Sequence, residues 1–431
     1  MKIAVIGGIG ALPRKIGGIP GGNRPEEFGD IYLERFLHRV ARYQTSDLVA
    51  VIGGLVADME YVYEYKKMMA LLQQSKLPII AAANQSDPCG LNLFKTSYCL
   101  ENGKLLKLRS MNDSVSGDIN FTLGEPGSRL EINCENNLTN IVIPPCRGEK
   151  LSYAMIEIDE AGNCRGEECD LKMSAELGLY DFHIHTSRAY CAEDLTPDKT
   201  VALMKIFNLR GGALVEHSGQ LFYALREYWS SRYNSNYPEN SQLNDEALAA
   251  MLYRRHQAMA EAKLDLYRGI ELDVASDGRV IGSRELDEAC QVRLGAIHAF
   301  DCNQSCGAVA AEREFLIRLA GLCRGKIDIL AHPFRVLYQR KIPLTLDLMA
   351  AVAGILKQHG IAAEINFHCG NKPELEFFAM CLAENVKLTF GSDTHASYEV
   401  GEFYPHWELI KQLGIAHDYT KYFWSPTGKK R

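Results

Sequence analysis

Two histidines separated by one residue, His183 and His185, are the clearest sign of chemistry in this sequence of 431 residues. On a β-strand, side chains two positions apart point to the same face, so both imidazoles can bind one metal cluster. Two ordinary histidines on a half-exposed strand would show the same spacing. Of the twelve histidines, only His38 precedes residue 183, which predicts that the chemistry lies in the C-terminal half.

Further potential metal ligands recur along this half. They are Glu216 with His217, Glu271, His298, His332, and Asp393 with His395. Imidazole nitrogens and carboxylate oxygens together suit Zn, Mn or Fe, and count against Mg. Eight or nine donors are too many for one ion, so we expect two or three divalent transition metal ions bridged by Glu271. Such clusters activate water and bind a phosphoryl oxygen at the same time.

Seven apolar, strand-like runs end in or near these residues. The runs cover 180–185, 212–217, 267–273, 293–298, 327–332, 362–366 and 387–395. Segments of helix length lie between them, at 196–209, 220–232, 244–266, 308–323, 345–359 and 374–384. In a (β/α) barrel the C-terminal ends of the strands meet on one face, where the active site lies. The sequence therefore predicts one shared pocket.

The ordered motifs of this half resemble those of the polymerase and histidinol phosphatase (PHP) superfamily. They are Asp181-Phe-His183-Ile-His185, Glu216-His217, Gly269-Ile-Glu271, Ala296-Ile-His298, Asp328-Ile-Leu-Ala-His332-Pro333 and Ser392-Asp393-Thr-His395, within about residues 177–400. The resemblance implies a distorted seven-stranded (β/α) barrel with a di- or trinuclear metal site. It also implies hydrolysis of a phosphate ester.

The resemblance further implies how the ligands are divided. One ion would be held by His183, His185, Glu271 and Asp393, a second by Glu271, His298 and His332, and a third by His217 and His395. The missing ligand of the third ion falls near Cys191, where a thiolate ligand and a buried free thiol are alternatives. Glu216 replaces an Asp of the family, and we expect it to orient a ligand histidine, with Asp181 also in a supporting position.

Arginines close to the motifs are candidates for binding substrate. Arg188 and Arg335 can each hold a phosphate through two parallel hydrogen bonds, although both also fit surface positions. With Glu271 and Asp393 they form our set of candidate catalytic residues. We expect Asn366 and His368 around the pocket. The remaining histidines, which we interpret as structural, are His38, His256, His359, His406 and His417.

The first half has a different pattern. Strands at 2–6, 48–52 and 78–82 alternate with helices at 29–43 and 61–74, which predicts a βαβαβ unit. Short alternating runs follow at 105–108, 118–123, 129–132, 140–143 and 152–158, and residues 160–172 suggest a linker. We therefore predict an α/β N-terminal domain at 1–172 and a barrel at 173–431.

The N-terminal domain resembles, more distantly, a calcineurin-like metallophosphoesterase. The strand before Gly8 and Gly10, the run from Asp47 to Gly54, and Asn84-Gln85 stand where that family has metal ligands. The ligands themselves are replaced, which implies a domain without its own dinuclear site that serves regulation, substrate covering or assembly. An alternative for residues 7–10 is a nucleotide-phosphate loop, although Pro13 occupies the place of the third glycine.

Composition narrows the classes of function. The net charge of −7 disfavours nucleic acid as a partner. No apolar run approaches the ~20 residues of a membrane span, and the N-terminus does not resemble a signal peptide, so we expect a cytoplasmic protein. Thirteen scattered cysteines do not suggest disulfides, and the Cys164/Cys169 and Cys302/Cys306 spacings do not suit a zinc knuckle.

Together these features favour a phosphatase in which a metal-activated hydroxide hydrolyses a phosphate ester of a small metabolite. The alternatives are a nuclease or exonuclease, and a non-catalytic module that binds metal or nucleotide. The substrate and the oligomeric state do not follow from the sequence. Residues 218–242, with Tyr223, Tyr228 and Tyr233, either cover the mouth of the pocket or pack between domains.

Overall fold

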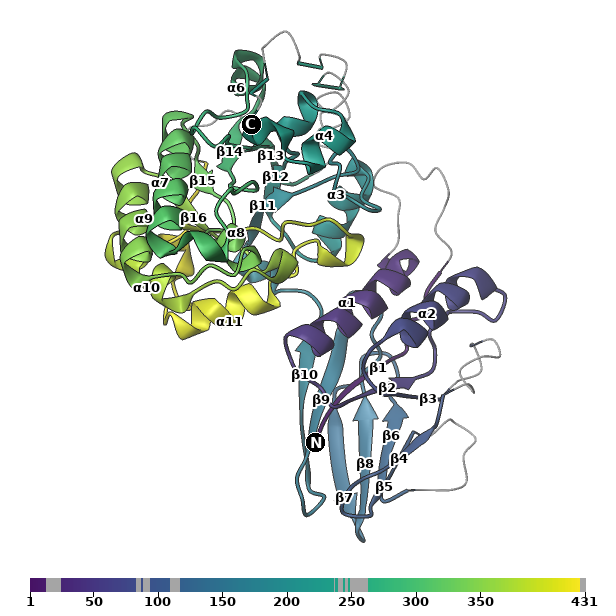
Figure 1. Cartoon of the computed structure of the whole chain (residues 1–431). Helices are drawn as coiled ribbons and strands as arrows, with labels where there is room; N and C mark the ends of the chain where they lie inside the picture. Colours follow the sequence, from purple (N-terminus) through teal and green to yellow (C-terminus); the bar gives the residue numbers. More distant parts are fainter. Residues whose placement is uncertain are drawn as a thin grey trace. The chain divides into compact units, whose positions relative to one another are not determined.

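The computed structural model describes residues 1–12, 25–82, 87, 94–108, 117–235, 237–238, 243–244, 247–248 and 263–426. The chain divides into two compact units, Met1–Met173 and Ser174–Arg431 (Figure 1). Among the helices of the described residues, none combines the length and apolarity that crossing a membrane requires.

A five-stranded sheet forms the centre of the first unit. Strands β1 (Lys2–Gly7), β2 (Leu48–Ile52) and β3 (Ile79–Ala82) are parallel and alternate along the chain with α1 (Gly29–Arg42) and α2 (Val62–Gln74), which confirms the predicted βαβαβ pattern. β9 (Ser152–Ile158) and β10 (Cys164–Asp170) extend this sheet antiparallel beyond β1. The predicted linker is therefore wrong, because its acids lie on an exposed edge strand.

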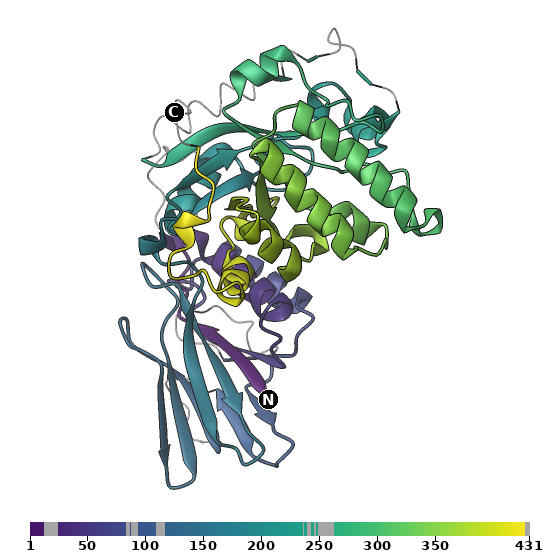
Figure 2. The same cartoon turned by 90° about the vertical axis from the view of Figure 1, so that its left-hand side faces the viewer.

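A second five-stranded sheet packs against the first. Its order is β4 (Ser97–Cys99), β5 (Leu105–Leu108), β6 (Ile119–Leu123), β8 (Leu138–Ile143) and β7 (Glu131–Glu135). Alternating apolar residues of both sheets share one core, in which Val5 and Ala50 lie with Phe121 and Ile141. α1 and α2 lie side by side along the first sheet (Figure 2).

The second unit is a barrel of seven parallel strands in sequence order, as predicted. They are β11 (Tyr180–Ile184), β12 (Gly211–Leu214), β13 (Asp265–Leu272), β14 (Val292–Gly295), β15 (Ile329–Leu330), β16 (Ala362–Ile365) and β17 (Leu388–Phe390). The first and last strands meet where Ile184 and Thr394 form a parallel bridge and the amide of Asp393 donates to the carbonyl of His183 at 2.8 Å.

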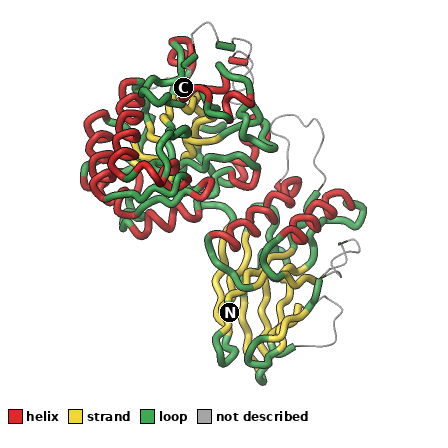
Figure 3. Tube along the Cα trace, in the orientation of Figure 1, coloured by secondary structure: helices red, strands yellow, loops and turns green. Residues whose placement is uncertain are grey.

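Helices surround these strands (Figure 3). They are α3 (Pro197–Ile206), α4 (Leu225–Trp229), α6 (Arg284–Ala289), α7 (Ala308–Arg324), α8 (Arg335–Gln339), α9 (Leu346–His359), α10 (Leu375–Ala383) and α11 (Tyr404–Gln412). Thr196 and Thr345 accept hydrogen bonds from the first-turn amides of α3 and α9, so both begin near the predicted residues.

Two helix predictions in this unit differ from the structure. The helix expected at 220–232 is reduced to α4 between two short 3₁₀ turns. Most of the helix expected at 244–266, including His256, lies outside the described residues, and its last two residues already belong to β13. The short helices α6 and α8 and the C-terminal α11 were not predicted, because none carries a long apolar period.

The site residues at the strand ends lie next to the apolar core of the barrel. Phe182 of β11 joins a buried apolar cluster with Tyr267 and Leu294. Glu271 stands four residues after Tyr267 on β13 and therefore shares its face. His183 and His185 are fully buried at the end of β11, where the pairing with β12 is irregular.

Candidate metal centre

Glu271, at the end of β13, is the centre of the site and is fully buried. Its Oε1 lies 2.9 Å from His332 Nε2, 3.2 Å from His298 Nε2 and 3.5 Å from His183 Nε2. Its Oε2 lies 2.8 Å from His217 Nδ1 and 3.5 Å from His185 Nε2. One carboxylate thus faces five imidazoles from four strand ends, which is the geometry of a bridging ligand.

His183, His185 and Glu271 form the first group that can hold an ion, since their ligand atoms lie within 4.8 Å of one another. The Nε2 atoms of the two histidines are 3.3 Å apart. Asp393 Oδ1 lies 3.5 Å from His183 Nε2 and 3.3 Å from His185 Nε2. The structure thus brings together the four residues expected around one ion.

His217, Glu271 and His298 form a second group of the same kind. The backbone explains part of this placement, because His217 and Glu271 are partners in a parallel β-bridge. His332 approaches the same Glu271 oxygen as His298. His217 therefore lies with the residues expected around the second ion as well as beside those of the third.

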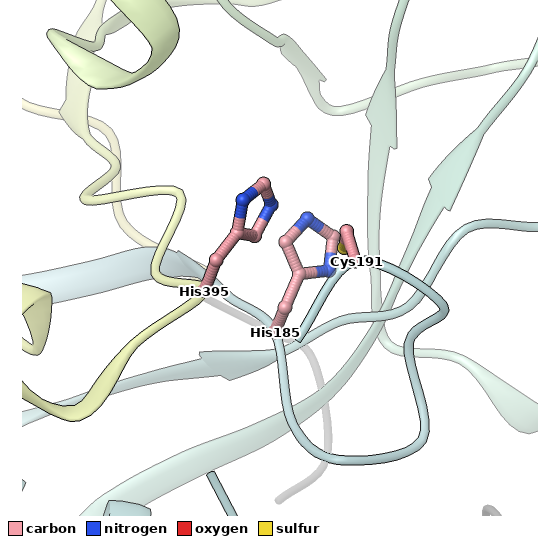
Figure 4. A group of neighbouring side chains, drawn as sticks. All are labelled: His185, Cys191 and His395. Atoms are coloured by element: carbon pink, nitrogen blue, oxygen red, sulfur yellow. The ribbon is translucent and has the colours of Figure 1, made fainter. Parts of the chain in front are cut away.

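His185, Cys191 and His395 form a third group (Figure 4). Cys191 comes from the loop after β11, and its Sγ lies 3.3 Å from His217 Nε2. His395 Nε2 lies 3.4 Å from Asp393 Oδ1. The loop thus places the thiol beside imidazoles, while burial and the carboxylates of Asp393 and Glu271 raise its pKa.

Several of these atoms lack hydrogen bonds, which fits metal ligands. Within the part of the chain that the structure describes, His217 Nδ1, Glu271 Oε2, His298 Nε2 and His395 Nε2 are buried without a hydrogen-bond partner. His217 Nδ1 and Glu271 Oε2 are only 2.8 Å apart but are not aligned for a hydrogen bond. Buried polar atoms are costly unless they are paired or bind an ion. Imidazole, carboxylate and thiolate together suit Zn.

The charges of the site are strongly coupled. Burial raises the pKa of Glu271, but His298, His183 and His217 outweigh it and hold that pKa well below 4.5. Burial likewise opposes ionisation of Asp393, whose pKa is held low by His183 and Arg335. Burial and the adjacent Arg335 lower the pKa of His332 to about 3. Both carboxylates are thus ionised and His332 is neutral, as metal binding requires.

Two further acids support the imidazoles and were missed in the sequence. Asp273 Oδ1 lies 2.7 Å from His298 Nδ1, and Glu364 Oε1 lies 2.7 Å from His183 Nδ1. Both contacts fix which ring nitrogen faces the centre. The sequence signal was available, since Asp273 stands two residues after Glu271 and Glu364 is the single acid of a buried strand. A Cβ on Gly391 would lie 1.7 Å from Glu364 Oε1, so this approach requires glycine.

The residues expected in supporting positions lie around the same centre. Asp181 Oδ1 accepts hydrogen bonds from the amides of His183 and Ser392, and burial raises the pKa of Asp181 to about 7. Glu216 accepts a 2.7 Å hydrogen bond from Thr186. The Asn366 amide donates to Glu364 and Asp393, at 3.1 and 3.2 Å.

The two candidate arginines differ. The buried guanidinium of Arg335 donates to Asp393 Oδ2, and its Nη2 lies 2.7 Å from His332 Nε2. Arg188 is half-buried, and the structure places its backbone carbonyl 2.7 Å from the Gln220 amide. Arg335 therefore reaches the centre, whereas the contacts of Arg188 are those of its backbone.

The tyrosines of the loop after β12 pack within the barrel unit. Tyr223, Tyr228 and Tyr233 are buried in a cluster with Ile281 and Ala299, while residues 236 and 239–242 of this segment lie outside the described residues. The ring of Tyr228 lies 5.3 Å from that of His217 and 5.0 Å from that of Trp229, which is 54% exposed. Trp229 thus presents an exposed aromatic surface next to the centre, as does Tyr190, which is 37% exposed and also contacts Tyr228.

The backbone amides of the glycines after β1 are already hydrogen-bonded within the first unit. The amides of Gly8 and Gly10 donate to the carbonyls of Gly53 and Gly54, and Asp87 accepts from the amides of Gly54 and Leu55. These amides are thus not available to a phosphate, which contradicts the nucleotide-loop alternative. Three residues that were also used to interpret the N-terminal domain lie outside the described residues. They are Pro13, Asn84 and Gln85.

No protein-family model matches the chain, and no curated protein matches it. Among solved structures it is similar to a protein described as a histidinol phosphatase from Listeria monocytogenes, with 14% identity over 53% of this chain and 99% of the other, at a TM-score of 0.40. It is also similar to histidinol phosphate phosphatase from Lactococcus lactis, complexed with zinc, L-histidinol and phosphate, with 17% identity, coverage of 55% and 94%, and a TM-score of 0.39.

A third similar structure is an archaeal phosphodiesterase, with 11% identity over 39% of this chain and all of the other, at a TM-score of 0.27. Identities and TM-scores of this size do not establish a family. We therefore base the functional proposal on the side chains of the site itself.

Proposed function

We propose that the chain is a metal-dependent phosphoesterase whose second unit hydrolyses a phosphate ester of a small metabolite. The observation that supports this most directly is the Glu271 carboxylate among five imidazoles, together with buried ligand atoms that have no hydrogen-bond partner in the described part of the chain. The three neighbouring groups of ligands would bind two or three divalent transition metal ions, which are Zn, Mn or Fe.

Ions bound there would act as Lewis acids toward a phosphoryl oxygen and lower the pKa of a water molecule. The protein supplies the orientation. Glu364 and Asp273 hold the rings of His183 and His298 by Nδ1, so that Nε2 of each ring faces Glu271. Asp393 and Glu271 remain ionised and compensate the charge of the ions.

Arg335 is our candidate for binding the substrate phosphate. Its guanidinium is already at the centre and bridges Asp393 and His332. The planar guanidinium has further donors that match phosphate oxygens. Trp229 is our candidate for contact with the rest of the substrate, because its exposed ring lies 6.3 Å from that of His217.

We also propose that the first unit has no dinuclear site of its own and serves regulation, substrate covering or assembly. At the ends of β1 and β2, glycines take the places where side-chain ligands would be needed. The four ligand groups found among the described residues all belong to the second unit.

The proposal is tested by measuring phosphate release from a broad panel of phosphorylated metabolites. Protein loaded with Mn or Zn is compared with a chelated sample and with the variant carrying His183→Ala and His185→Ala. We expect metal-dependent release from a few compounds and none from the variant. The same release from the variant would contradict the proposal.

Other outcomes identify the alternatives. Loss of nucleotides from DNA or RNA in place of metabolite hydrolysis would replace the proposal by a nuclease. Binding of a phosphorylated compound without turnover under any metal would replace it by a binding module.

A further inference from the structure

His368, Cys369 and His395 form a fourth group of possible metal ligands, at the edge of the proposed centre. Their ligand atoms lie within 4.8 Å of one another. His368 and Cys369 follow β16 and His395 follows β17, so neighbouring strands of the barrel bring the group together. The ring centroids of the two histidines are 4.1 Å apart. Only His395 of the three also belongs to the groups assigned to the centre.

The orientation of His368 is that of a metal ligand. Its Nδ1 lies 3.2 Å from Glu399 Oε1, and Glu399 is itself held by the amides of His395 and Ala396, at 2.8 and 3.0 Å. The His368 side chain is only 10% exposed, and its Nε2 is buried without a hydrogen-bond partner among the described residues. A carboxylate on one ring nitrogen fixes the orientation of the ring and keeps a proton there, so the other nitrogen faces a position where an ion can displace its proton.

The ligand types define the class of ion. One thiolate with two imidazoles suits Zn or another thiophilic transition metal, whereas Mg and Ca prefer oxygen ligands. Cys369 is exposed, so the thiol can lose its proton to solvent when an ion binds.

We propose that His368, Cys369 and His395 bind a zinc ion that competes with the main centre for His395. A neutral imidazole has one lone pair, so His395 serves either this outer site or the group with His185 and Cys191. Zinc at the outer site would withdraw a ligand from the centre. Excess zinc would then inhibit an enzyme that needs metal for activity.

The direct test is the rate at which an alkylating reagent modifies Cys369 in the full-length protein, measured by mass spectrometry of the peptides after quenching and digestion. Zinc is added at increasing concentrations to metal-loaded protein, with Mg as a second arm. Cys306 is the internal control, because it is an exposed free cysteine of the same unit. At ten times the dissociation constant of the site, zinc should slow modification of Cys369 about tenfold.

We expect no such protection of Cys306, none by Mg, and loss of protection in the His368→Gln variant. If Cys369 is alkylated at the same rate at all zinc concentrations, the proposal of an outer zinc site is wrong. Because this measurement does not use turnover, it decides on the outer site even if the protein hydrolyses no phosphate ester.

Inhibition gives a second, independent readout if the phosphoesterase proposal holds. Excess zinc should inhibit the unmodified chain and the Cys306→Ser variant alike, whereas Cys369→Ser should keep most of its activity at the same zinc concentration. Equal inhibition of all three proteins would overturn competition for His395.

Discussion

Both units of this chain contain parallel strands, but the residues at the C-terminal ends of these strands differ: they include glycines in the first unit and polar side chains in the second. β1 ends in Gly7 and β2 is followed by Gly53, and a Cβ on Gly7 would lie 2.1 Å from the Ile52 carbonyl oxygen, so the two backbones are too close for a larger residue at Gly7. β11 and β13 end in His183 and Glu271. The same strand arrangement thus serves close packing in one unit and a polar centre in the other.

The two regions also differ in how buried polar atoms are satisfied. Near the end of β2, the Asp87 carboxylate accepts two backbone hydrogen bonds, each of 2.7 Å. In the barrel, buried nitrogens such as His298 Nε2 and His395 Nε2 lack hydrogen-bond partners among the described residues. The first region is thus satisfied by hydrogen bonds, whereas the second leaves buried atoms that our proposal assigns to bound ions.

The largest effect is expected from Glu271→Gln, which leaves the size of the side chain unchanged but removes its charge. Losing the shared carboxylate should lower kcat for phosphate release at least ~1000-fold, because several kcal/mol of metal-dependent stabilisation are lost. Glu285→Gln, at an exposed acid of the same unit, is the control. Activity of Glu271→Gln close to that of the control would contradict the role of Glu271.

Glu364→Gln should have a smaller effect, because Glu364 acts through His183 and the His332 amide. We expect a loss of about 10- to 100-fold in metal affinity or activity, typical of residues that orient a ligand. Metal titrations followed by activity would measure it, with the exposed Glu376→Gln as control. An unchanged metal affinity would show that the position of His183 does not depend on this contact.

His406 is a buried histidine that does not belong to the proposed metal centre. Burial lowers its pKa to about 4, while its Nε2 donates to the Gly391 carbonyl at 3.1 Å. Below the ordinary pKa of 6.5, the unfolded chain takes up a proton that the folded protein does not. Stability is therefore lost as the pH falls from 6.5 toward 4, by about 1.4 kcal/mol per pH unit from this residue.

Urea unfolding in the presence of a chelator would measure this loss, because metal release then does not contribute. His406→Gln, which keeps a donor for Gly391, should show a shallower pH dependence than the unmodified chain. His417→Gln, at a side chain that is 78% exposed, should not. Equal slopes for all three proteins would exclude His406 as the source.

The smallest effect is expected in the first unit, from Gly8→Ala. Gly8 has φ +61°, and an added Cβ would lie 2.7 Å from the Pro145 Cβ. Gly103→Ala is matched to it, with φ +83° and no atom within 4 Å of the added Cβ. Gly8→Ala should be less stable than Gly103→Ala by about 1 kcal/mol or more in urea unfolding, since overpacking adds to backbone strain. Phosphate release per folded molecule should stay unchanged in both variants, and a loss specific to Gly8→Ala would instead link this loop to turnover.

The barrel was predictable because each of its strands is an apolar run that ends in a distinctive polar residue. The grouping at Glu271 also followed from spacing, since strand ends converge in a barrel. The roles of Asp273 and Glu364 did not, because an acid that supports a histidine looks in sequence like any other acid. β10 was missed because its charged residues suggested a linker, whereas pairing with β9 keeps this exposed strand in the sheet.

The central claim is that the strand ends of the barrel hold a metal cluster. The most direct measurement is the metal content of the intact chain after dialysis against zinc or manganese, beside the variant carrying His183→Ala and His185→Ala. We predict two or three ions per chain in the unmodified protein and at least one fewer in the folded variant. Equal metal content in the two proteins would contradict the claim.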